Sequence, residues 1–279
     1  MRAAAIQMSA TVEVAENLAT ARRLVSEAVR EGAELVVLPE KWPVLGATHH
    51  MRAGAQALDG ELVGELCGLA AKLGIDLVAG SISETADDDD ERLYNSSVHI
   101  GPDGQVRAVY RKLHLFDVDL ESISYRESDG ERAGDEIVCS EAADGSKIGL
   151  SICFDLRFAE LYRAMALAGA RVLCVPSAFT LETTRAHWEV LLRARAIEQQ
   201  CFVIAANQYG PSASGIESGG RSMIVDAWGE VLAQAPESGE AVLVADLDMD
   251  HLEEVRRRIP AHSARRSDVY ADPGPIIDP

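Results

Sequence analysis

Cysteine is sparse in this sequence of 279 residues, and its five cysteines lie far apart, at positions 67, 139, 153, 174 and 201. No two of them have the close spacing that a disulfide framework or a zinc site requires. We therefore expect free thiols in a reducing compartment, which indicates a cytoplasmic protein without a metal site.

Long apolar segments and positive charge are also scarce. No uninterrupted apolar run approaches the roughly 18 to 20 residues that span a membrane, and the segment from Met1 to Val14 lacks the apolar core of a secretory signal. The chain has 26 lysines and arginines against 45 aspartates and glutamates, a formal net charge of -19 and a pI near 4.7. Such a surface repels phosphate backbones and anionic lipids, so we expect neither a nucleic-acid nor a membrane partner.

Apolar residues are abundant enough for a large core. They make up 47% of the chain, and its mean hydropathy is -0.01, as is typical of a packed globular protein. No internal repeat or linker divides the chain, so we expect a single domain over residues 1–279. The segment 262–279 is rich in proline and aspartate and has little periodicity, which predicts an extended C-terminal arm.

Apolar periodicity predicts an alternation of strands and helices. Alternating residues on both sides of the turn at 101–104 indicate an antiparallel hairpin. The other strands are expected at 3–8, 34–40, 75–80, 147–153, 171–179, 201–208, 220–229, 230–235 and 241–248, and the helices at 13–31, 60–73, 155–170, 187–200 and 248–260. Strands this apolar need cover on both faces. We therefore expect an α/β fold in which two mixed sheets pack together between outer helices, a four-layer α-β-β-α sandwich.

Three residues that follow predicted strands could take part in chemistry. Cys153 ends a strand and precedes a predicted helix, whose dipole is expected to favour the thiolate. Glu40 ends the strand 34–40, where partial burial would raise the pKa of its carboxyl group and suit it to act as a general base. Lys112 follows the strand that ends at Tyr110. Taken singly, each has an ordinary alternative: an inert core cysteine, a loop carboxylate and a solvated lysine.

The segments around these residues are more specific. LPEKW, YRKLHLFDVD and SICFDLRFAELYR together resemble the nitrilase or carbon-nitrogen hydrolase superfamily, whose members use a glutamate, a lysine and a cysteine in this chain order. Similarity continues through VPSAFT, AHWEVLLRARAIEQQCFVIAANQ, GRSMIVDAWGEVLA and RRRIPAHSARRSDVY, and so covers nearly the whole chain. The resemblance implies that Glu40 is the general base, Cys153 the nucleophile and Lys112 the cation that stabilises the oxyanion.

The resemblance also implies further parts of the site. The backbone N–H of Phe154 is expected to be a second oxyanion donor, and losing one such donor slows acyl transfer by on the order of a hundredfold or more. Glu127, in the segment SYRES, is similar to the additional active-site glutamate of the superfamily and is expected to orient Lys112 and the leaving group. The implied reaction passes through a thioester on Cys153 and needs neither a metal nor an organic cofactor.

Within the superfamily, CFDLRFAEL, LFDVD with YRES, and AHWEVLLRARAIE resemble most the branch of the omega-amidases and deaminated-glutathione amidases, which implies a small linear amide as substrate. Phe154 stands where classical nitrilases usually have tryptophan, so nitrile hydrolysis is a weaker expectation. Where the branch often has Gly-Pro, this chain has Thr184 and Arg185. Arg185 is predicted to pair with a substrate carboxylate, and a solvent-facing arginine is the alternative. Two other functions stay open: hydrolysis of an N-carbamoyl amino acid, and a non-catalytic scaffold that keeps the fold.

Other polar residues near these segments are expected to have structural roles. His114 and His187 are predicted to be hydrogen-bonding partners, not members of a cysteine–histidine dyad. Asp155, Arg157 and Glu160 are predicted to form a charge network that fixes the turn after Cys153.

The resemblance further implies a homodimer or a larger homo-oligomer that pairs through helices. The candidate surface is the predicted helix 187–200, which has four apolar residues on one side: Val190, Leu191, Ala194 and Ile197. The alternative is that this stripe faces the protein's own sheet.

Overall fold

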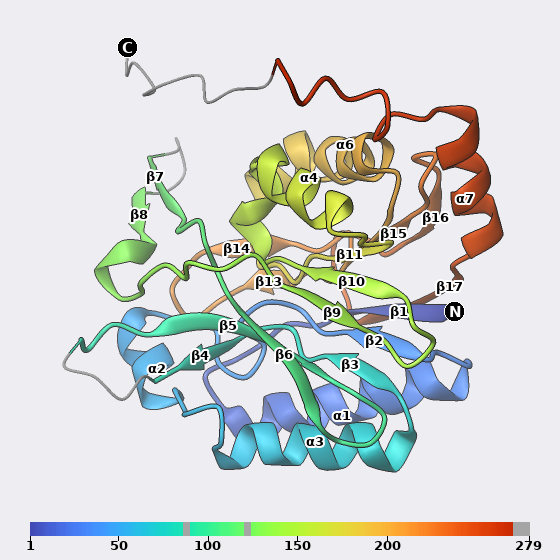
Figure 1. The fold of residues 1–279 in the computed structure, drawn as a ribbon. Coiled ribbons are helices and arrows are strands. Elements are labelled where there is room, and N and C mark those ends of the chain that lie inside the picture. The colour runs from blue at the N-terminus through green and yellow to red at the C-terminus, as the bar shows by residue number, and fades with distance from the viewer. Residues whose placement is uncertain (86–89, 120–123, 270–279) are drawn as a thin grey trace.

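The computed structural model describes residues 1–85, 90–119 and 124–269. Two sheets pack face to face, with helices α1 and α3 outside one sheet and α4 and α6 outside the other (Figure 1). The predicted four-layer α-β-β-α sandwich is therefore confirmed. Its helices are α1 (Val14–Arg30), α2 (Thr48–Ala53), α3 (Glu61–Leu73), α4 (Ala159–Leu167), α5 (Leu181–Thr183), α6 (Glu189–Gln199) and α7 (Met249–Arg258).

The first sheet has seven strands in the order β17-β1-β2-β3-β5-β4, and β6 also pairs with β5. It is mixed, because β1, β2 and β3 run parallel while the other pairings are antiparallel. Its strands are β1 (Arg2–Gln7), β2 (Leu35–Val37), β3 (Asp76–Val78), β4 (Ile82–Glu84), β5 (Tyr94–Ile100), β6 (Val106–Arg111) and β17 (Ala241–Asp246).

The second sheet has six strands in the order β16-β15-β12-β11-β10-β9, with a parallel centre of β10, β11 and β12. Its strands are β9 (Cys139–Glu141), β10 (Lys147–Leu150), β11 (Val172–Cys174), β12 (Phe202–Ala205), β15 (Met223–Val225) and β16 (Val231–Gln234). Two hairpins lie outside both sheets: β7 (Asp117–Asp119) with β8 (Ser124–Arg126), and β13 (Tyr209–Pro211) with β14 (Glu217–Gly219).

The core follows from the alternation of side chains along the strands. Successive residues of a strand point to opposite faces of the sheet. On β2, Leu35 and Val37 pack in the cluster shared by the two sheets, while Val36 packs in a second cluster with α1 and α3. Both faces of the first sheet are therefore buried, which explains why its strands are apolar throughout.

A buried polar chain links the two sheets. His99 of β5 contacts Ser140 of β9 through Nδ1 at 2.7 Å and Asp76 of β3 through Nε2 at 3.2 Å. The backbone N–H of Ala143 donates to the other Asp76 oxygen at 2.9 Å. All three side chains are buried, and a buried polar group of this kind is tolerated because it is hydrogen-bonded.

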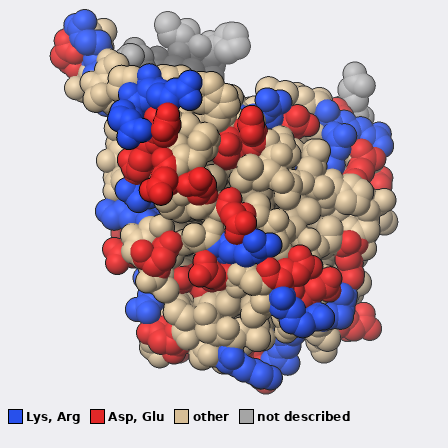
Figure 2. Space-filling view, turned by 90° about the vertical axis from the view of Figure 1, so that its right-hand side faces the viewer, with Lys and Arg blue, Asp and Glu red and all other residues tan. Residues whose placement is uncertain are grey.

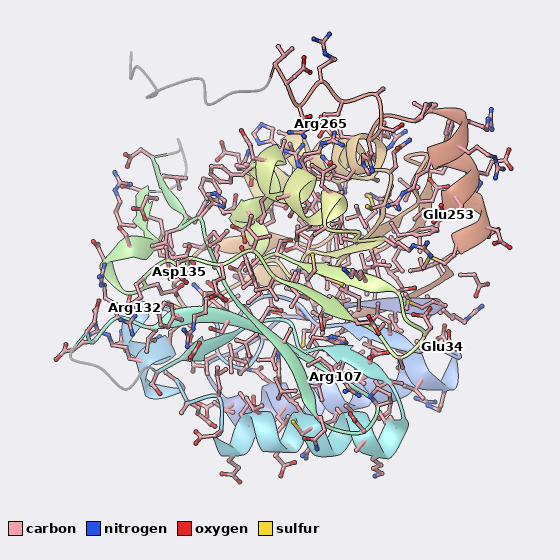
Figure 3. All side chains as sticks on the ribbon, in the orientation of Figure 1. Glu34, Arg107, Arg132, Asp135, Glu253 and Arg265 are labelled. Carbon is pink, nitrogen blue, oxygen red and sulfur yellow. The ribbon has the colours of Figure 1, made fainter. Side chains whose placement is uncertain are left out.

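Other charged side chains lie on the outer surface of the sandwich. Figure 3 shows Arg107 of β6 and Glu253 of α7 on the outside of the sandwich. Arg107 pairs with Asp103 at 2.8 Å and Glu253 with Arg171 at 2.7 Å. On the face around α7, acidic and basic side chains are interspersed with uncharged surface (Figure 2). Among the described residues, no helix has both the length and the apolarity to span a bilayer.

Several predicted strands are longer than the observed ones, as for 171–179 against β11 and 220–229 against β15, and the elements on both sides of Cys153 also differ. The strand before Cys153 ends at Leu150, and the helix after it begins only at Ala159. Residues Cys153–Arg157 form a 3-10 turn, and Phe158 is extended, with φ -104° and ψ 91°, which separates the turn from the helix. Of the predicted arm, residues 262–269 are mostly exposed, and 270–279 lie outside the described residues.

The fold brings together the chain segments that follow β2, β10 and β11. Cys153 N donates to Pro176 O at 2.8 Å, and Glu40 N donates to Ser177 O at 3.4 Å. Behind Glu40, Gly80 has φ +62°, and a Cβ atom there would lie 2.0 Å from Pro39 O. Only glycine fits this close approach, so Gly80 allows the loop before Glu40 to lie against the sheet.

Candidate active site

Glu40, Lys112 and Cys153 form one buried group in the structure. They follow β2, β6 and β10 respectively. Lys112 Nζ lies 2.9 Å from Glu40 Oε1. Together with burial, the charge of the Glu40 carboxylate and its hydrogen bond with the Cys153 thiol raise the pKa of that thiol. Each of the three residues is less than a tenth exposed. The structure thus brings together the three residues that the sequence predicted to be catalytic.

Both carboxylate oxygens of Glu40 are held by hydrogen bonds. Asn95 Nδ2 and Lys112 Nζ each donate to Oε1 at 2.9 Å. Ala178 N donates to Oε2 at 2.8 Å. Hydrogen bonds from fixed donors lock a carboxylate in one orientation, so Glu40 faces the thiol in a defined geometry.

Glu127 lies on the other side of Lys112, as the sequence predicted. Lys112 Nζ is 2.9 Å from Glu127 Oε2 and 3.1 Å from Oε1, and Phe116 N donates to Oε2 at 2.7 Å. Burial would raise the pKa of Glu127, but Lys112 and Lys41 hold this pKa well below its ordinary value. Burial alone would lower the pKa of Lys112, but Glu127 and Glu40 raise this pKa well above its ordinary value. Glu127 is therefore a carboxylate and Lys112 an ammonium group.

Two charged residues of this cluster were not predicted from the sequence. Lys41 Nζ lies 2.8 Å from Glu127 Oε1 and 2.6 Å from Glu131 Oε1. Burial raises the pKa of Glu131 to about 8, although Lys41 opposes this rise. The available signal was their position, since Lys41 directly follows Glu40 and Glu131 lies four residues after Glu127.

Asp155 fixes the turn that presents Cys153. The Cys153 backbone is left-handed, with φ 48°, an unfavourable conformation for a residue with a Cβ atom. Asp155 accepts hydrogen bonds from Tyr110 Oη at 2.6 Å, from Ile152 N at 2.8 Å and from His114 N at 3.1 Å. The carboxylate thus holds the strained turn from three sides.

The predicted charge network of Asp155, Arg157 and Glu160 is only partly present. Asp155 does fix the turn, but its partners are those described above, and Glu160 is exposed. His114 contacts Asp155 through Nδ1 at 2.7 Å, which confirms its expected structural role. His187 Nδ1 lies 3.3 Å from the Arg157 guanidinium.

The expected thiolate at Cys153 is not supported. α4 begins only at Ala159, six residues after Cys153, so Cys153 is not in the first turn of this helix, where the dipole acts most strongly. Burial, together with the Glu40 carboxylate, raises the pKa of the Cys153 thiol well above its ordinary value, although Lys112 opposes this rise. The resting group is a thiol whose proton must be removed by a neighbouring base.

Cys153, Glu40, Lys112 and Glu127 line a cavity of about 650 Å³, its open mouth included. Its wall is largely apolar and includes Leu45, Met51, Phe116, Phe154, Phe179 and Ile216. Three hydroxyl groups come from the hairpin β13–β14 and its turn: Ser212, Ser214 and Ser218. An apolar cavity with a few polar groups is typical of a site for a small molecule.

Arg157 also lines this cavity. Its guanidinium lies 5.8 Å from the centre of the Phe154 ring and 5.3 Å from that of Phe179. Among the described residues, no carboxylate forms an ion pair with it, and burial lowers the pKa of Arg157. Arginine nevertheless stays charged in proteins, so a cation without a counter-ion faces the cavity.

Arg185 does not join this group. Its side chain is 60% exposed, and its guanidinium pairs with Glu237 at 2.6 Å and 3.0 Å. It lines a neighbouring hollow together with Glu182 and Glu217. The expected contact between Arg185 and a substrate carboxylate is therefore not supported by the geometry. The sequence placed an arginine near the mouth, but Arg157 is the one that lines the cavity.

Comparison with known proteins gives a consistent result. Residues 2–257 match the family model of the carbon-nitrogen hydrolases. The chain is 38% identical to omega-amidase NIT2 of Danio rerio, over 97% of this chain and 96% of that protein. It is 40% identical to deaminated glutathione amidase of Mus musculus, over 97% and 85%. The crystal structure of the C. elegans NitFhit protein superposes with a TM-score of 0.88 at 37% identity, over 97% of this chain and 66% of that one.

Glu40→Gln is expected to lower the pKa of the Cys153 thiol, because it removes a carboxylate that raises this pKa. More thiolate is then present at about pH 8, and a decrease of one in the pKa gives about tenfold more while the thiol is mostly protonated. Alkylation of Cys153 by iodoacetamide should become faster. Mass spectrometry of the tryptic peptide Ile148–Arg157, which contains no other cysteine, measures this rate.

Glu160→Gln is the matched control, since Glu160 is exposed near the same turn. This control should react like the wild-type protein. A slower reaction of the Glu40→Gln variant would contradict the expected effect of Glu40 on the thiol.

Proposed function

The chain belongs to the carbon-nitrogen hydrolase family, and from this premise we propose that it hydrolyses a small linear amide bearing a carboxylate, releasing ammonia and an acid. One observation supports this most directly. A buried cysteine, glutamate and lysine line the same cavity as the guanidinium of Arg157. Both relatives compared above are named as amidases, which favours an amide over a nitrile.

In the first half of the proposed reaction, Glu40 accepts the thiol proton as Cys153 attacks the amide carbon. The carbonyl oxygen becomes an oxyanion, which is stabilised by Lys112 and by the backbone N–H of Phe154. The thiol pKa supports this assignment, because a raised pKa makes a general base necessary. Glu40 is the carboxylate that acts on the thiol, and its orientation is held by Asn95 and Ala178.

In the second half, Glu40 returns its proton to the amide nitrogen, the C–N bond breaks and ammonia leaves. A thioester remains on Cys153. Glu40 then takes a proton from water, and the resulting hydroxide attacks the thioester carbon. The C–S bond breaks, the acid leaves, and the sulfur takes the proton back from Glu40, which restores both the thiol and the base. Glu127 takes no proton in this scheme and orients Lys112, which its two contacts of 2.9 Å and 3.1 Å support.

Arg157 is proposed to bind the carboxylate of the substrate. A guanidinium binds a carboxylate through two parallel hydrogen bonds. Its guanidinium lies near the rings of Phe154 and Phe179, which favours a position of the cation at the cavity. An N-carbamoyl amino acid also has a carboxylate and stays the alternative substrate, with carbon dioxide and an amine as additional products.

Ammonia release tests this proposal. The purified protein is given a carboxylate-bearing linear amide, a neutral aliphatic amide, an N-carbamoyl amino acid and a nitrile. We expect turnover of the first and none with Cys153→Ala, while Cys139→Ala, which removes a half-buried thiol outside the cavity, stays active. No turnover of any compound by the folded wild-type protein would overturn the proposal and favour the non-catalytic scaffold.

Arg157→Met is expected to raise KM for the carboxylate-bearing amide, because the variant keeps an apolar stem and loses the cation. A hydrogen bond to a charged group contributes about 1.5–3 kcal/mol, so kcat/KM should fall by roughly tenfold to a hundredfold. The neutral amide should be hydrolysed as before. Arg185→Met is the matched control, and a loss in this variant instead would restore Arg185 as the carboxylate-binding residue.

We also infer a homodimer that pairs through α6. Val190 is 68% exposed and Ile197 is 51% exposed, so these two residues of the apolar stripe face away from the protein's own sheet. Trp228, which is 44% exposed, lies one residue before Gly229, whose position is close to the Ile197 side chain. Apolar residues gathered on one surface are typical of a protein–protein contact.

The double substitution Val190→Asp and Ile197→Asp should shift the protein toward the monomer, because it places charges in the proposed contact. Sedimentation velocity measures the change in mass. Val106→Asp, at an exposed apolar residue of β6, is the control. A wild-type protein that sediments as a monomer would contradict the inference.

The cytoplasmic location stays a prediction from the sequence. It is supported by the five cysteines, which are all free thiols in the structure, as is usual in reducing compartments.

A further inference from the structure

A second buried lysine lies beside the proposed catalytic group. Lys41 is 5% exposed, and its ammonium group pairs with two buried carboxylates, Glu127 at 2.8 Å and Glu131 at 2.6 Å. Lys112 donates to the same Glu127 carboxylate. The reaction proposed above uses neither Lys41 nor Glu131, although both are buried in the same interior.

The backbone of Lys41 is also unusual. Its φ of 51° lies in the left-handed region, which costs a residue with a Cβ atom roughly 1–2 kcal/mol. The N–H of Lys41 donates to Ser81 Oγ at 3.0 Å, which helps to hold this conformation. Strained residues of this kind cluster at functional sites, and Lys41 directly follows Glu40.

The charges of the cluster explain what Lys41 contributes. Without it, Lys112 would be the single cation shared by the Glu40 and Glu127 carboxylates. With it, Glu127 accepts from Lys112, from Lys41 and from Phe116 N. Burial raises the pKa of Glu131 and also opposes the ionisation of Glu127, but Lys112 and Lys41 hold the pKa of Glu127 well below its ordinary value. Glu127 is therefore the carboxylate that both lysine cations contact.

We propose that Lys41 is a positioning residue, which fixes the Glu127 carboxylate so that Lys112 stays directed at Glu40 and at the oxyanion. Glu131 in turn places the Lys41 ammonium group. Lys41 also lines the cavity, but its ammonium group is paired with Glu127 and Glu131, so its proposed action passes through Glu127 and Lys112. This inference rests on the proposed amide hydrolysis for its kinetic consequence, but its effect on the Cys153 thiol does not depend on any substrate.

Two variants separate positioning from simple stabilisation. Lys41→Met leaves Glu131 buried without its cation, and removing one member of a buried ion pair strongly destabilises a protein. The double variant Lys41→Met with Glu131→Leu replaces both members by apolar side chains of similar size, a change that is often tolerated. The control is Lys72→Met at an exposed lysine. Thermal unfolding identifies which variants are folded.

The first readout is alkylation of Cys153 by iodoacetamide, followed on the peptide Ile148–Arg157. Lys112 lowers the pKa of the thiol, so a displaced Lys112 should leave less thiolate. In the folded double variant we expect alkylation about tenfold slower at a fixed pH, as for a rise of one in the thiol pKa. The control should match the wild-type protein.

The second readout is the separation of kcat from KM with the amide that the wild-type protein hydrolyses. The double variant should lose about tenfold to a hundredfold in kcat, as for impaired oxyanion stabilisation, while KM stays nearly unchanged. Wild-type alkylation and wild-type kcat in the folded double variant would overturn the proposal and leave Lys41 as a partner of Glu131 only.

The two readouts also distinguish this inference from the proposed function. If the wild-type protein hydrolyses no amide, the proposed function fails, and the alkylation rates still decide on Lys41. If amide hydrolysis is found but the double variant resembles the wild-type protein in both readouts, only the role of Lys41 fails.

Discussion

Glu40, Lys41, Lys112, Glu127 and Glu131 form one buried cluster of ion pairs. The pairing of their opposite charges is the constraint on which the rest of the site depends. An isolated charge in the interior would cost several kcal/mol. Lys112 therefore lies between Glu40 and Glu127, and Lys41 between Glu127 and Glu131. The ion pairs of the cluster form one continuous network, so the position of each side chain depends on the others.

The sandwich meets this constraint because its strands end at the same place. Glu40 follows β2, in the parallel part of the first sheet, and Cys153 follows β10, in the parallel part of the second. The backbone after β11 accepts a hydrogen bond from the N–H of each. Since the carboxyl ends of β2 and β10 meet there, residues 113 positions apart in the chain face each other. The buried network also accounts for the state of the nucleophile. A thiol beside a carboxylate and away from a helix dipole stays protonated, which protects it from oxidation, because thiolates are the form that oxidants attack.

The sequence predicted the parts of the structure that depend on local pattern. The helices α1 and α3 and the strand β1 were placed to within a residue, and the segments LPEKW, YRKLHLFDVD and SICFDLRFAELYR together pointed to Glu40, Lys112 and Cys153. It could not predict the start of α4, because helical spacing does not reveal that the Phe158 backbone is extended while its N–H donates to Asp155 O. Lys41 was missed because a lysine in a single sequence gives no sign that a distant Glu131 will neutralise it. Arg157 was assigned to a local charge network with Asp155 and Glu160, because helical spacing does not reveal that the turn places Arg157 at the cavity.

Part of the cavity wall comes from a hairpin outside the two sheets, whereas the proposed catalytic residues follow strands of the sheets. Glu40, Lys112 and Cys153 are attached to sheet strands, whereas Ser212, Ser214 and Ser218 belong to the hairpin β13–β14, which lies outside both sheets. Loops of this kind tolerate insertions and substitutions that a packed sheet does not. In evolutionary terms, substitutions in this hairpin can reshape one part of the cavity wall while the strands that present Glu40, Lys112 and Cys153, and the turn that carries Arg157, stay as they are.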